Sequence, residues 1–165
     1  YGPVEPHEVP RYWNPRKSYK SLGSLIHFHS RILGVDEKLK SIIEQMDPGV
    51  HEFFGLEIRM PKNVIFDKKY YILRVGQYFD AFSRNDSCEG SVDESENVPG
   101  LLHLNETKKG ISGLAFRRDD FGQAHLWRDR RLGFQERLTC FSDELIAEID
   151  RSGLRLPKHY KMREV

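Results

Sequence analysis

Two histidines on one predicted strand are the residues whose type and spacing come nearest to a metal site. His27-Phe28-His29 places two imidazoles two positions apart, so both can point to one side of a strand. A protein metal site needs three or four ligands, and no HExxH, paired CxxC or EF-hand pattern supplies the others. His51, His103 and His125 would have to come from elsewhere in the fold. We expect no metal and no cofactor, and keep a metal-dependent hydrolase or nuclease-like enzyme built on these histidines as an alternative.

The residues that could act as nucleophiles lack the partners that nucleophilic catalysis requires. No GxSxG turn and no family-type cysteine signature is present, and the phosphate-binding patterns GxGxxG and GxxxxGK[ST] are absent as well. Cys140 precedes a predicted helix, but it alternates like a strand residue, so we expect a buried, inert thiol. Cys88 and Cys140 are expected to stay reduced, as in a cytoplasmic protein. The sequence therefore favours a protein that is not an enzyme.

Residues 117–137 combine arginines with aromatic side chains. This composition is typical of single-strand nucleic-acid binders and also of the anchors of protein interfaces. Acidic residues within the same stretch dilute its positive charge, so we predict an ordinary solvated hairpin and keep a nucleic-acid-binding module as a second alternative. The basic and aromatic members are Arg117, Arg118, Trp127, Arg128, Arg130, Arg131, Phe134 and Arg137.

The stretch 86–100 is acidic and nearly free of apolar residues. It cannot bury enough apolar surface to offset the entropy of ordering, so we expect a mobile loop. A flexible negative segment steers a basic partner toward the domain. Its candidate binding residues are Asp93, Glu94 and Glu96.

Length and composition limit the class of protein. The 165 residues are 38% hydrophobic and 31% charged with a net charge of +1, which is typical of a single globular domain. No apolar run approaches the roughly 18 residues of a membrane span, and no strong net charge points to nucleic acid. Within one domain, 1–165, we expect a proline-rich extended arm at 1–20 that packs against the body, and a basic tail at 157–165.

The elements that position these residues follow from hydrophobic periodicity and turn residues. Helices are predicted at 35–46, with Asp36 as a possible cap, and from the Ser142 cap to Gly153. Two of the predicted strands, 64–66 and 70–75, are expected to form a hairpin around residues 67–69. A tight reversal at 119–122 is expected to join the strands 111–118 and 123–128. The other predicted strands are 50–60, 79–82, 101–104 and 138–141. The pattern predicts an α+β fold in which an antiparallel or mixed β-sheet is packed by a helix in the N-terminal half and a C-terminal helix.

Three segments, taken in order, resemble a known family. They are 30–59, which includes Asp47-Pro48-Gly49-Val50-His51; 70–83, which starts Tyr70-Tyr71-Ile72-Leu73-Arg74-Val75; and His125-Leu126-Trp127-Arg128 followed by Phe141-Ser142-Asp143-Glu144-Leu145 and Ser152-Gly153-Leu154. Together they resemble the bacterial immunity protein family numbered eleven, over roughly residues 22–156. Its members are encoded beside polymorphic or type VI-delivered toxins. The long loop at 86–100 and the basic tail after Leu156 depart from the family pattern.

The resemblance implies a cytoplasmic protein that binds and neutralises a cognate toxin as a stoichiometric inhibitor. No catalysis, nucleic acid or membrane is expected, and a homodimer is one possible assembly. Tight inhibition needs on the order of 1,600 Å² of buried surface around a few anchors, for which arginine and aromatic side chains are suited. The predicted toxin-binding residues are Trp127, Arg128, Arg130, Arg131 and Phe134, together with Asp93, Glu94 and Glu96.

Overall fold

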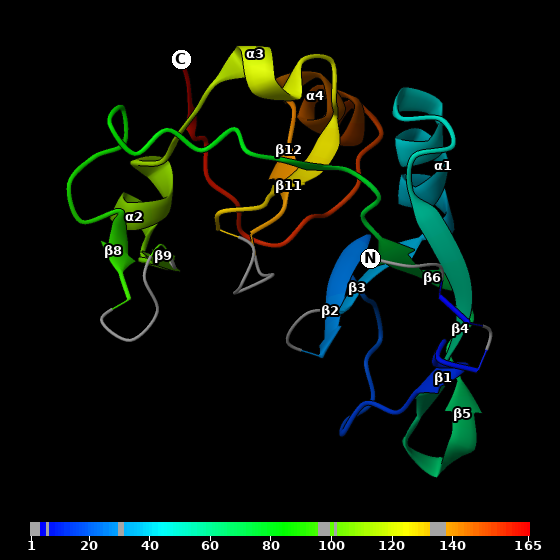
Figure 1. Cartoon of the computed structure of the whole chain (residues 1–165). Coiled ribbons are helices and arrows are strands. Elements are labelled where there is room, and N and C mark those ends of the chain that lie inside the picture. Colours follow the sequence, from blue (N-terminus) through cyan, green and yellow to red (C-terminus); the bar gives the residue numbers. More distant parts are fainter. Residues whose placement is uncertain (1–3, 6, 30–31, 96–99, 101, 133–137) are drawn as a thin grey trace. The chain divides into compact units, whose positions relative to one another are not determined.

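The chain divides into two compact units, which are described separately. The computed structural model describes residues 4–5, 7–29, 32–95, 100, 102–132 and 138–165 (Figure 1). Unit 1 comprises Tyr1–Arg74 and Ala147–Pro157, and unit 2 comprises Val75–Ile146 and Lys158–Val165. Both units contain helices together with runs of strands, which confirms the predicted α+β class. The expected single-domain organisation stays a prediction.

Unit 1 is built on a mixed sheet in the order β1-β4-β6-β3-β2, with β5 also paired to β4 (Figure 1). Strand β1 runs parallel to β4, and the other neighbours are antiparallel. Alternation of buried Leu56, Ile58 and Met60 with more exposed neighbours makes β4 the half-buried strand that the sequence predicts. The strands are β1 Tyr12–Trp13, β2 Leu25–His29, β3 Ile32–Asp36, β4 Glu52–Met60, β5 Val64–Ile65 and β6 Tyr70–Arg74.

Helix α1, Glu37–Met46, packs against β3 and β6 through one apolar face. Leu39, Ile42 and Ile43 are buried, at the spacing of a helix with one side in the core. The Asp36 carboxylate accepts a hydrogen bond from the Leu39 N–H at 2.9 Å, so the predicted cap is confirmed. The helix begins two residues later than predicted because Val35 belongs to β3, where it pairs with Tyr71.

The predicted hairpin between residues 64–66 and 70–75 is wrong. Strands β5 and β6 both pair with β4, and the Phe66 N–H donates to the Ile58 carbonyl, so the chain continues along β4 through residues 67–69. The reversal lies one step earlier, in the short 3-10 helix η1, Pro61–Asn63. Lys62 and Asn63 there have positive φ angles of 65° and 59°.

The N-terminal arm packs onto this sheet, as the sequence predicts. Strand β1 pairs with Glu57 and Ile58 of β4, and the ring centroids of Trp13 and Phe28 lie 5.1 Å apart. Extended backbone around the prolines leaves these aromatic side chains free to pack.

Unit 2 has three small sheets around an aromatic core. Their orders are β12-β11-β7, β8-β9 and β10-β13. The core includes Phe82, Phe116, Phe121 and Trp127. The strands are β7 Tyr78–Phe79, β8 Val92–Glu94, β9 Leu102–Leu104, β10 Ala115–Phe116, β11 Leu126–Asp129, β12 Cys140–Phe141 and β13 Arg163–Glu164.

Several predictions for unit 2 need correction. Residues 111–118 and 123–128 do not form a hairpin, because helix α2, Lys108–Ser112, takes the first part and helix α3, Arg118–Phe121, takes the predicted reversal. Thr107 caps α2 by accepting a hydrogen bond from the Gly110 N–H. This capping favours a helix over the strand that the apolar alternation from residue 111 onward suggested. The acidic stretch 86–100 also contains β8, which pairs with β9. The basic tail docks through β13, parallel to β10.

Helix α4, Asp143–Arg151, starts in unit 2 and ends in unit 1. The Ser142 hydroxyl accepts from the Leu145 N–H at 3.0 Å, and Gly153 has a φ of 67°, so both predicted ends are confirmed. Among the residues that the structure describes, no helix has the length and apolar character that crossing a membrane requires.

Candidate protein-binding surface

The predicted arginines and the predicted acidic residues both belong to unit 2. One buried carboxylate in this unit forms hydrogen bonds with backbone N–H groups of two separate chain segments. Asp129, the last residue of β11, is 2% exposed. Its Oδ2 accepts from the Phe82 N–H at 2.7 Å, and its Oδ1 accepts from the N–H groups of Arg131 at 2.8 Å and Leu132 at 3.2 Å. Burial raises the pKa of this carboxyl group, and the backbone hydrogen bonds oppose that rise.

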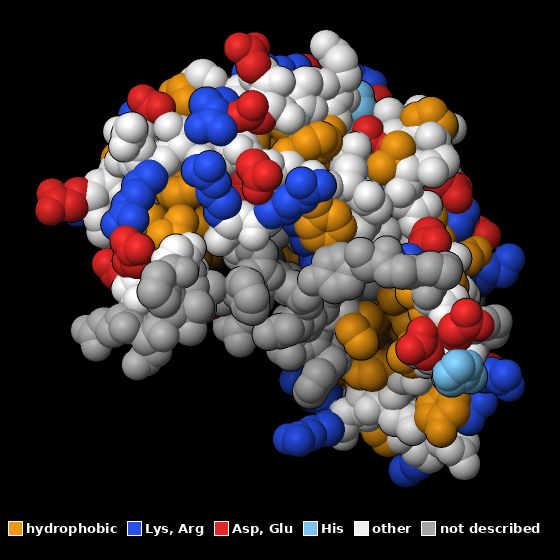
Figure 2. Space-filling model, viewed as in Figure 1, with side chains coloured by type: hydrophobic (Ala, Val, Ile, Leu, Met, Phe, Trp, Pro, Cys, Tyr) orange, Lys and Arg blue, Asp and Glu red, His pale blue; other side chains and the backbone are white. Residues whose placement is uncertain are grey.

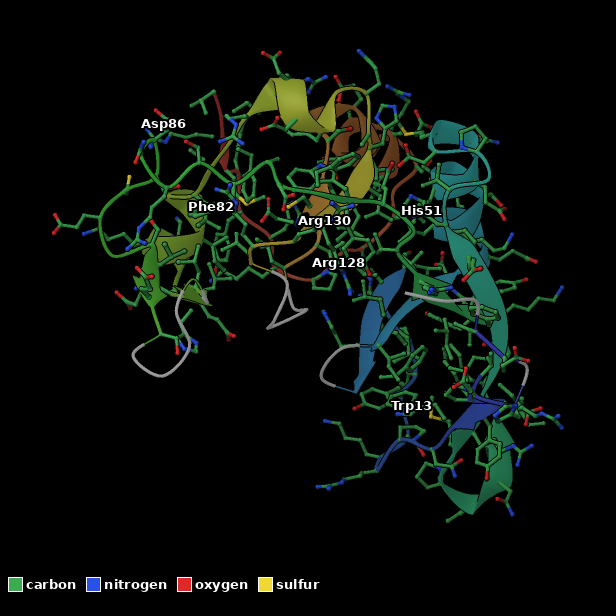
Figure 3. The ribbon with its side chains drawn as sticks, in the orientation of Figure 1. Trp13, His51, Phe82, Asp86, Arg128 and Arg130 are labelled. Carbon is green, nitrogen blue, oxygen red and sulfur yellow. The ribbon has the colours of Figure 1, made fainter. Side chains whose placement is uncertain are left out.

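Arg130 and Arg131 are exposed at the end of β11, and Asp129 sets their position. Arg128 and Arg130 are both labelled in Figure 3. The Arg130 N–H donates to the Phe79 carbonyl, so the backbone of Arg130 is tied to β7. The Arg130 guanidinium lies 3.8 Å from the Asp80 carboxylate, and both groups are exposed. Arg128, in contrast, is buried, with its Nε 3.4 Å from the Thr139 hydroxyl, so its charged group is held within unit 2.

Residues 80–84 connect the two predicted binding regions. Asp80, at one end of this segment, faces Arg130, and Arg84, at the other end, donates to Glu94 of β8 at 2.9 Å. The Arg84 guanidinium lowers the pKa of Glu94. The backbone between Asp80 and Arg84 is held from two sides. On one side the Asp129 carboxylate accepts a hydrogen bond from the Phe82 N–H. On the other side the chain around β10 forms backbone hydrogen bonds with Ala81 and Ser83.

The result is a row of exposed, alternating charges, which we call the 80–84 strip. Arg117 extends it, because its guanidinium donates to the Asp80 carbonyl at 3.0 Å and to the Asp120 carboxylate. Over unit 2, at the upper left of Figure 2, Lys or Arg side chains alternate with Asp or Glu side chains around apolar ones. The strip is defined by Asp80, Arg84, Glu94, Arg117 and Arg130, flanked in sequence by Asp93 and Arg131.

Trp127 is buried, with 3% of its surface exposed, and belongs to the core of unit 2. Its ring stacks on Phe121 with centroids 4.8 Å apart and meets Phe116 edge-on at 5.2 Å. We expected an exposed anchor here, but all four residues of β11 are buried, and the large apolar area of an aromatic ring is a major source of core stability. Phe134 and Glu96, the remaining predicted binding residues, lie outside the described residues.

Sequence reasoning missed Asp80 and Arg84, and it placed Arg117 in the arginine-rich stretch without counting it among the binding residues. Asp80 and Arg84 are ordinary charged residues with no local pattern, and their charged partners are 10 or more residues away in the chain. Opposite charge alone is too common a signal to have singled them out.

The histidines considered as metal ligands are distributed over different elements. His51 is buried beside Asp47, with Nε2 at 3.2 Å from the carboxylate, and burial lowers its pKa. His125 contacts the Ser142 hydroxyl at 2.9 Å, His103 lies on β9, and His27 lies on β2. In the described part of the chain, no group of three or more His, Cys, Asp or Glu residues is arranged to hold a metal ion.

The two cysteines differ in exposure. Cys140 is buried in the core of unit 2, which confirms the predicted burial, and desolvation by that burial raises the pKa of its thiol. Cys88 is exposed and free.

Comparison with known proteins gives these observations a context. The model of the Imm11 immunity protein family matches residues 6–163, nearly the whole chain. The chain belongs to the Imm11 immunity protein family. This confirms the resemblance found in the sequence, and Imm11 membership implies a role in toxin immunity, with a toxin as the partner in general terms. Immunity proteins are generally not enzymes. No curated protein matches the chain.

Proposed function

We propose that this Imm11 protein neutralises a cognate bacterial toxin by binding it in a stoichiometric complex, without turnover. The observation that carries the proposal is the family match over residues 6–163 of the 165 residues. The toxin would belong to a polymorphic or type VI-delivered system, and the immunity protein would act in the cytoplasm, where such a toxin arrives.

The 80–84 strip is the surface that we propose for this contact. Its charges are held by the protein before any partner arrives, because the backbone of residues 80–84 is fixed by Asp129 and the chain around β10. Preorganised polar groups reduce the entropy that a complex must lose on forming. Alternating charges also favour one partner whose charges are complementary and disfavour others.

The pairing of the arginines favours a protein partner over nucleic acid. Arg117 pairs with Asp120, Arg118 with Glu164 and Arg130 with Asp80. Each carboxylate would repel a phosphate group placed against its arginine, whereas a protein partner can match both signs. A basic patch for nucleic acid would be expected to leave its charges uncompensated.

The test uses the protein encoded next to this gene as the probe. Co-expression should restore growth to cells that produce the neighbouring toxin, and the two proteins should co-purify in a fixed ratio. In vitro, toxin activity should fall linearly and reach its minimum at one molar equivalent of the immunity protein. Inactivation by trace amounts, increasing with time, would instead indicate an enzyme, and a toxin that kills equally in both strains would disprove the proposal.

A further inference from the structure

In the part of the chain that the structure describes, most of the exposed large apolar side chains lie at one end of the sheet in unit 1. Among the described residues, five large apolar side chains are at least one-third exposed. Three of them, Tyr12 at 50%, Val64 at 58% and Ile65 at 60%, lie on β1 and β5. Both strands pair with the last four residues of β4, so these three side chains surround a single strand end.

The strand register places four side chains on one face of the sheet. Tyr12 is opposite Glu57 and Ile65 is opposite Arg59, and residues two apart on β4 point to the same face. The other face of β4 carries Ile58 and Met60, both buried. Tyr12, Glu57, Arg59 and Ile65 therefore form an outward-facing group, which we call the Tyr12–Ile65 patch.

The charged members of this patch already hold one conformation. The Arg59 guanidinium carbon lies 4.3 Å from the centroid of the Tyr12 ring, and the Arg59 Nε donates to the Glu57 carboxylate. These contacts restrict the rotamers of a tyrosine and an arginine before any partner binds, which lowers the entropy cost of binding. Tyrosine and arginine are also the residue types enriched among the side chains that dominate binding energies.

The turn that carries β5 is strained, and it is exposed. Lys62 and Asn63 both have positive φ, a conformation that costs a residue with a side chain on the order of 1 kcal/mol and that glycine would adopt freely. Residues 62–65 are all exposed, so core packing does not require this shape. Two successive positive φ angles are typical of a tight turn between twisted antiparallel strands, and this turn holds β5, with Ile65, beside the end of β4.

The charge around the patch indicates the chemistry of its partner. Residues 11–13 and 57–69 contain five basic and two acidic side chains, a net charge of +3. Lys62 and Lys68 are exposed, and no ion pair within the described residues involves either of them. An apolar centre with free lysines at its margin fits a protein surface that is apolar in the middle and bordered by carboxylates.

We propose that the Tyr12–Ile65 patch is a second contact surface for the toxin. The patch covers an apolar area of the toxin surface that is bordered by acidic side chains. This inference rests on the proposed function. A lipid membrane is the less suitable occupant, because the one aliphatic side chain of the patch, Ile65, provides less apolar surface than the single acyl chain that gives only marginal, reversible anchoring.

The test compares two pairs of substitutions at exposed apolar positions. Tyr12→Ala with Ile65→Ser removes the apolar side chains of the patch. Tyr19→Ala with Val165→Ser, the matched control, removes the two exposed large apolar side chains that lie on neither β1 nor β5. Affinity for the catalytically inactive toxin, measured by calorimetry, should fall at least about tenfold for the patch variant and less than about twofold for the control. Equal melting temperatures would show that both variants fold.

A charge-reversed variant tests the predicted acidic border. Lys62→Glu with Lys68→Glu should slow association with the toxin, and the rate should depend less steeply on salt than that of the wild type. An unchanged association rate would contradict the acidic border.

The outcomes separate this inference from the proposed function. Wild-type protein that does not bind the toxin disproves the proposed function and, with it, this surface. Wild-type protein that binds while the patch variant binds equally well overturns only the Tyr12–Ile65 patch. Flotation with vesicles of phosphatidylcholine and phosphatidylserine that is lost in the patch variant would assign the patch to a membrane and also overturn the proposal.

Discussion

The Asp129 carboxylate accepts a hydrogen bond from the Phe82 N–H at 2.7 Å, across 47 positions of the chain. With its second oxygen it accepts from the N–H groups of Arg131 and Leu132. One buried side chain therefore fixes both the segment that carries Asp80 and Arg84 and the chain end that carries Arg130. Formation of the proposed 80–84 strip depends on this residue, although Asp129 itself is too buried to touch a partner.

Removing the Asp129 carboxyl group should destabilise the protein without changing its surface charge directly. Asp129→Ala leaves three backbone N–H groups without their acceptor, and we expect the free energy of unfolding to fall by about 3 kcal/mol. Chemical denaturation measures this loss. Asp93→Ala, at an exposed acidic position, is the control and should shift stability by less than about 0.5 kcal/mol. Equal stability of the two variants would contradict the role of Asp129.

Trp127 should behave as a core residue and not as an anchor for a partner. Trp127→Ala removes its contacts with Phe116 and Phe121, and the free energy of unfolding should drop by about 3–5 kcal/mol. Trp127→Phe keeps an aromatic ring in the core, so a variant that folds should bind the toxin with nearly wild-type affinity. A large loss of binding by Trp127→Phe at unchanged stability would show that the indole contacts the partner.

Replacing the two exposed arginines should weaken binding while leaving stability nearly unchanged. Arg130→Glu with Arg131→Glu reverses two charges at the end of β11, and we expect affinity for the toxin to fall at least about tenfold. The melting temperature should hardly move, because both side chains are exposed. Lys108→Glu with Lys109→Glu makes the same charge change at an adjacent exposed pair in unit 2 and should leave affinity intact. If both double variants bind equally well, the contact lies elsewhere.

Structural elements that are fixed by residues close together in the chain could be predicted from the sequence, whereas those fixed by distant residues could not. Local signals located both long helices: Asp36 and Ser142 cap them, and Gly153 ends the second. The incorrect prediction of a hairpin at residues 64–75 has its cause in contacts between distant parts of the chain. A polar stretch between two apolar runs suggests a turn, whereas the pairing of both runs with β4 is a tertiary choice that no local pattern encodes.

The candidate surface shows the same division between local and distant information. The arginine-rich stretch and the acidic stretch were each visible in the sequence, and three of their members, Arg117, Arg130 and Glu94, carry charges of the 80–84 strip. Their connection through Asp80 and Arg84 was not visible, because it depends on a buried carboxylate that binds backbone groups far away in the chain. Trp127 was misjudged because its arginine neighbours suggested an exposed strand, whereas all of β11, including Arg128, is buried.

The two cysteines should react at very different rates with a thiol reagent. Cys88 is exposed, whereas Cys140 is buried and its pKa is raised by burial, so its reactive thiolate form is scarce. Mass spectrometry after brief treatment with iodoacetamide should show one modified thiol in the native protein and two in guanidinium. Cys88→Ser should then show none in the native state. Rapid double modification of native protein would mean that the core of unit 2 opens readily.

His51 should make the stability of the protein depend on pH below neutrality. Burial lowers its pKa from 6.5, so the unfolded chain binds a proton at a pH where the folded protein does not. Its contribution to stability is complete above pH 6.5 and is lost as the pH falls toward the folded pKa. We expect the free energy of unfolding to decrease by up to about 1.4 kcal/mol per pH unit in that range.

Urea denaturation at several pH values between 7.5 and 5 would measure this slope. His51→Asn removes the titrating group and should flatten it, even if the variant is less stable at every pH. His7→Asn, at an exposed histidine of the arm, is the control and should keep the wild-type slope. The range lies above the usual titration of carboxyl groups, so acidic residues whose pKa is lowered, such as Glu94, contribute little to it. A slope that survives in His51→Asn would assign the pH dependence to another group.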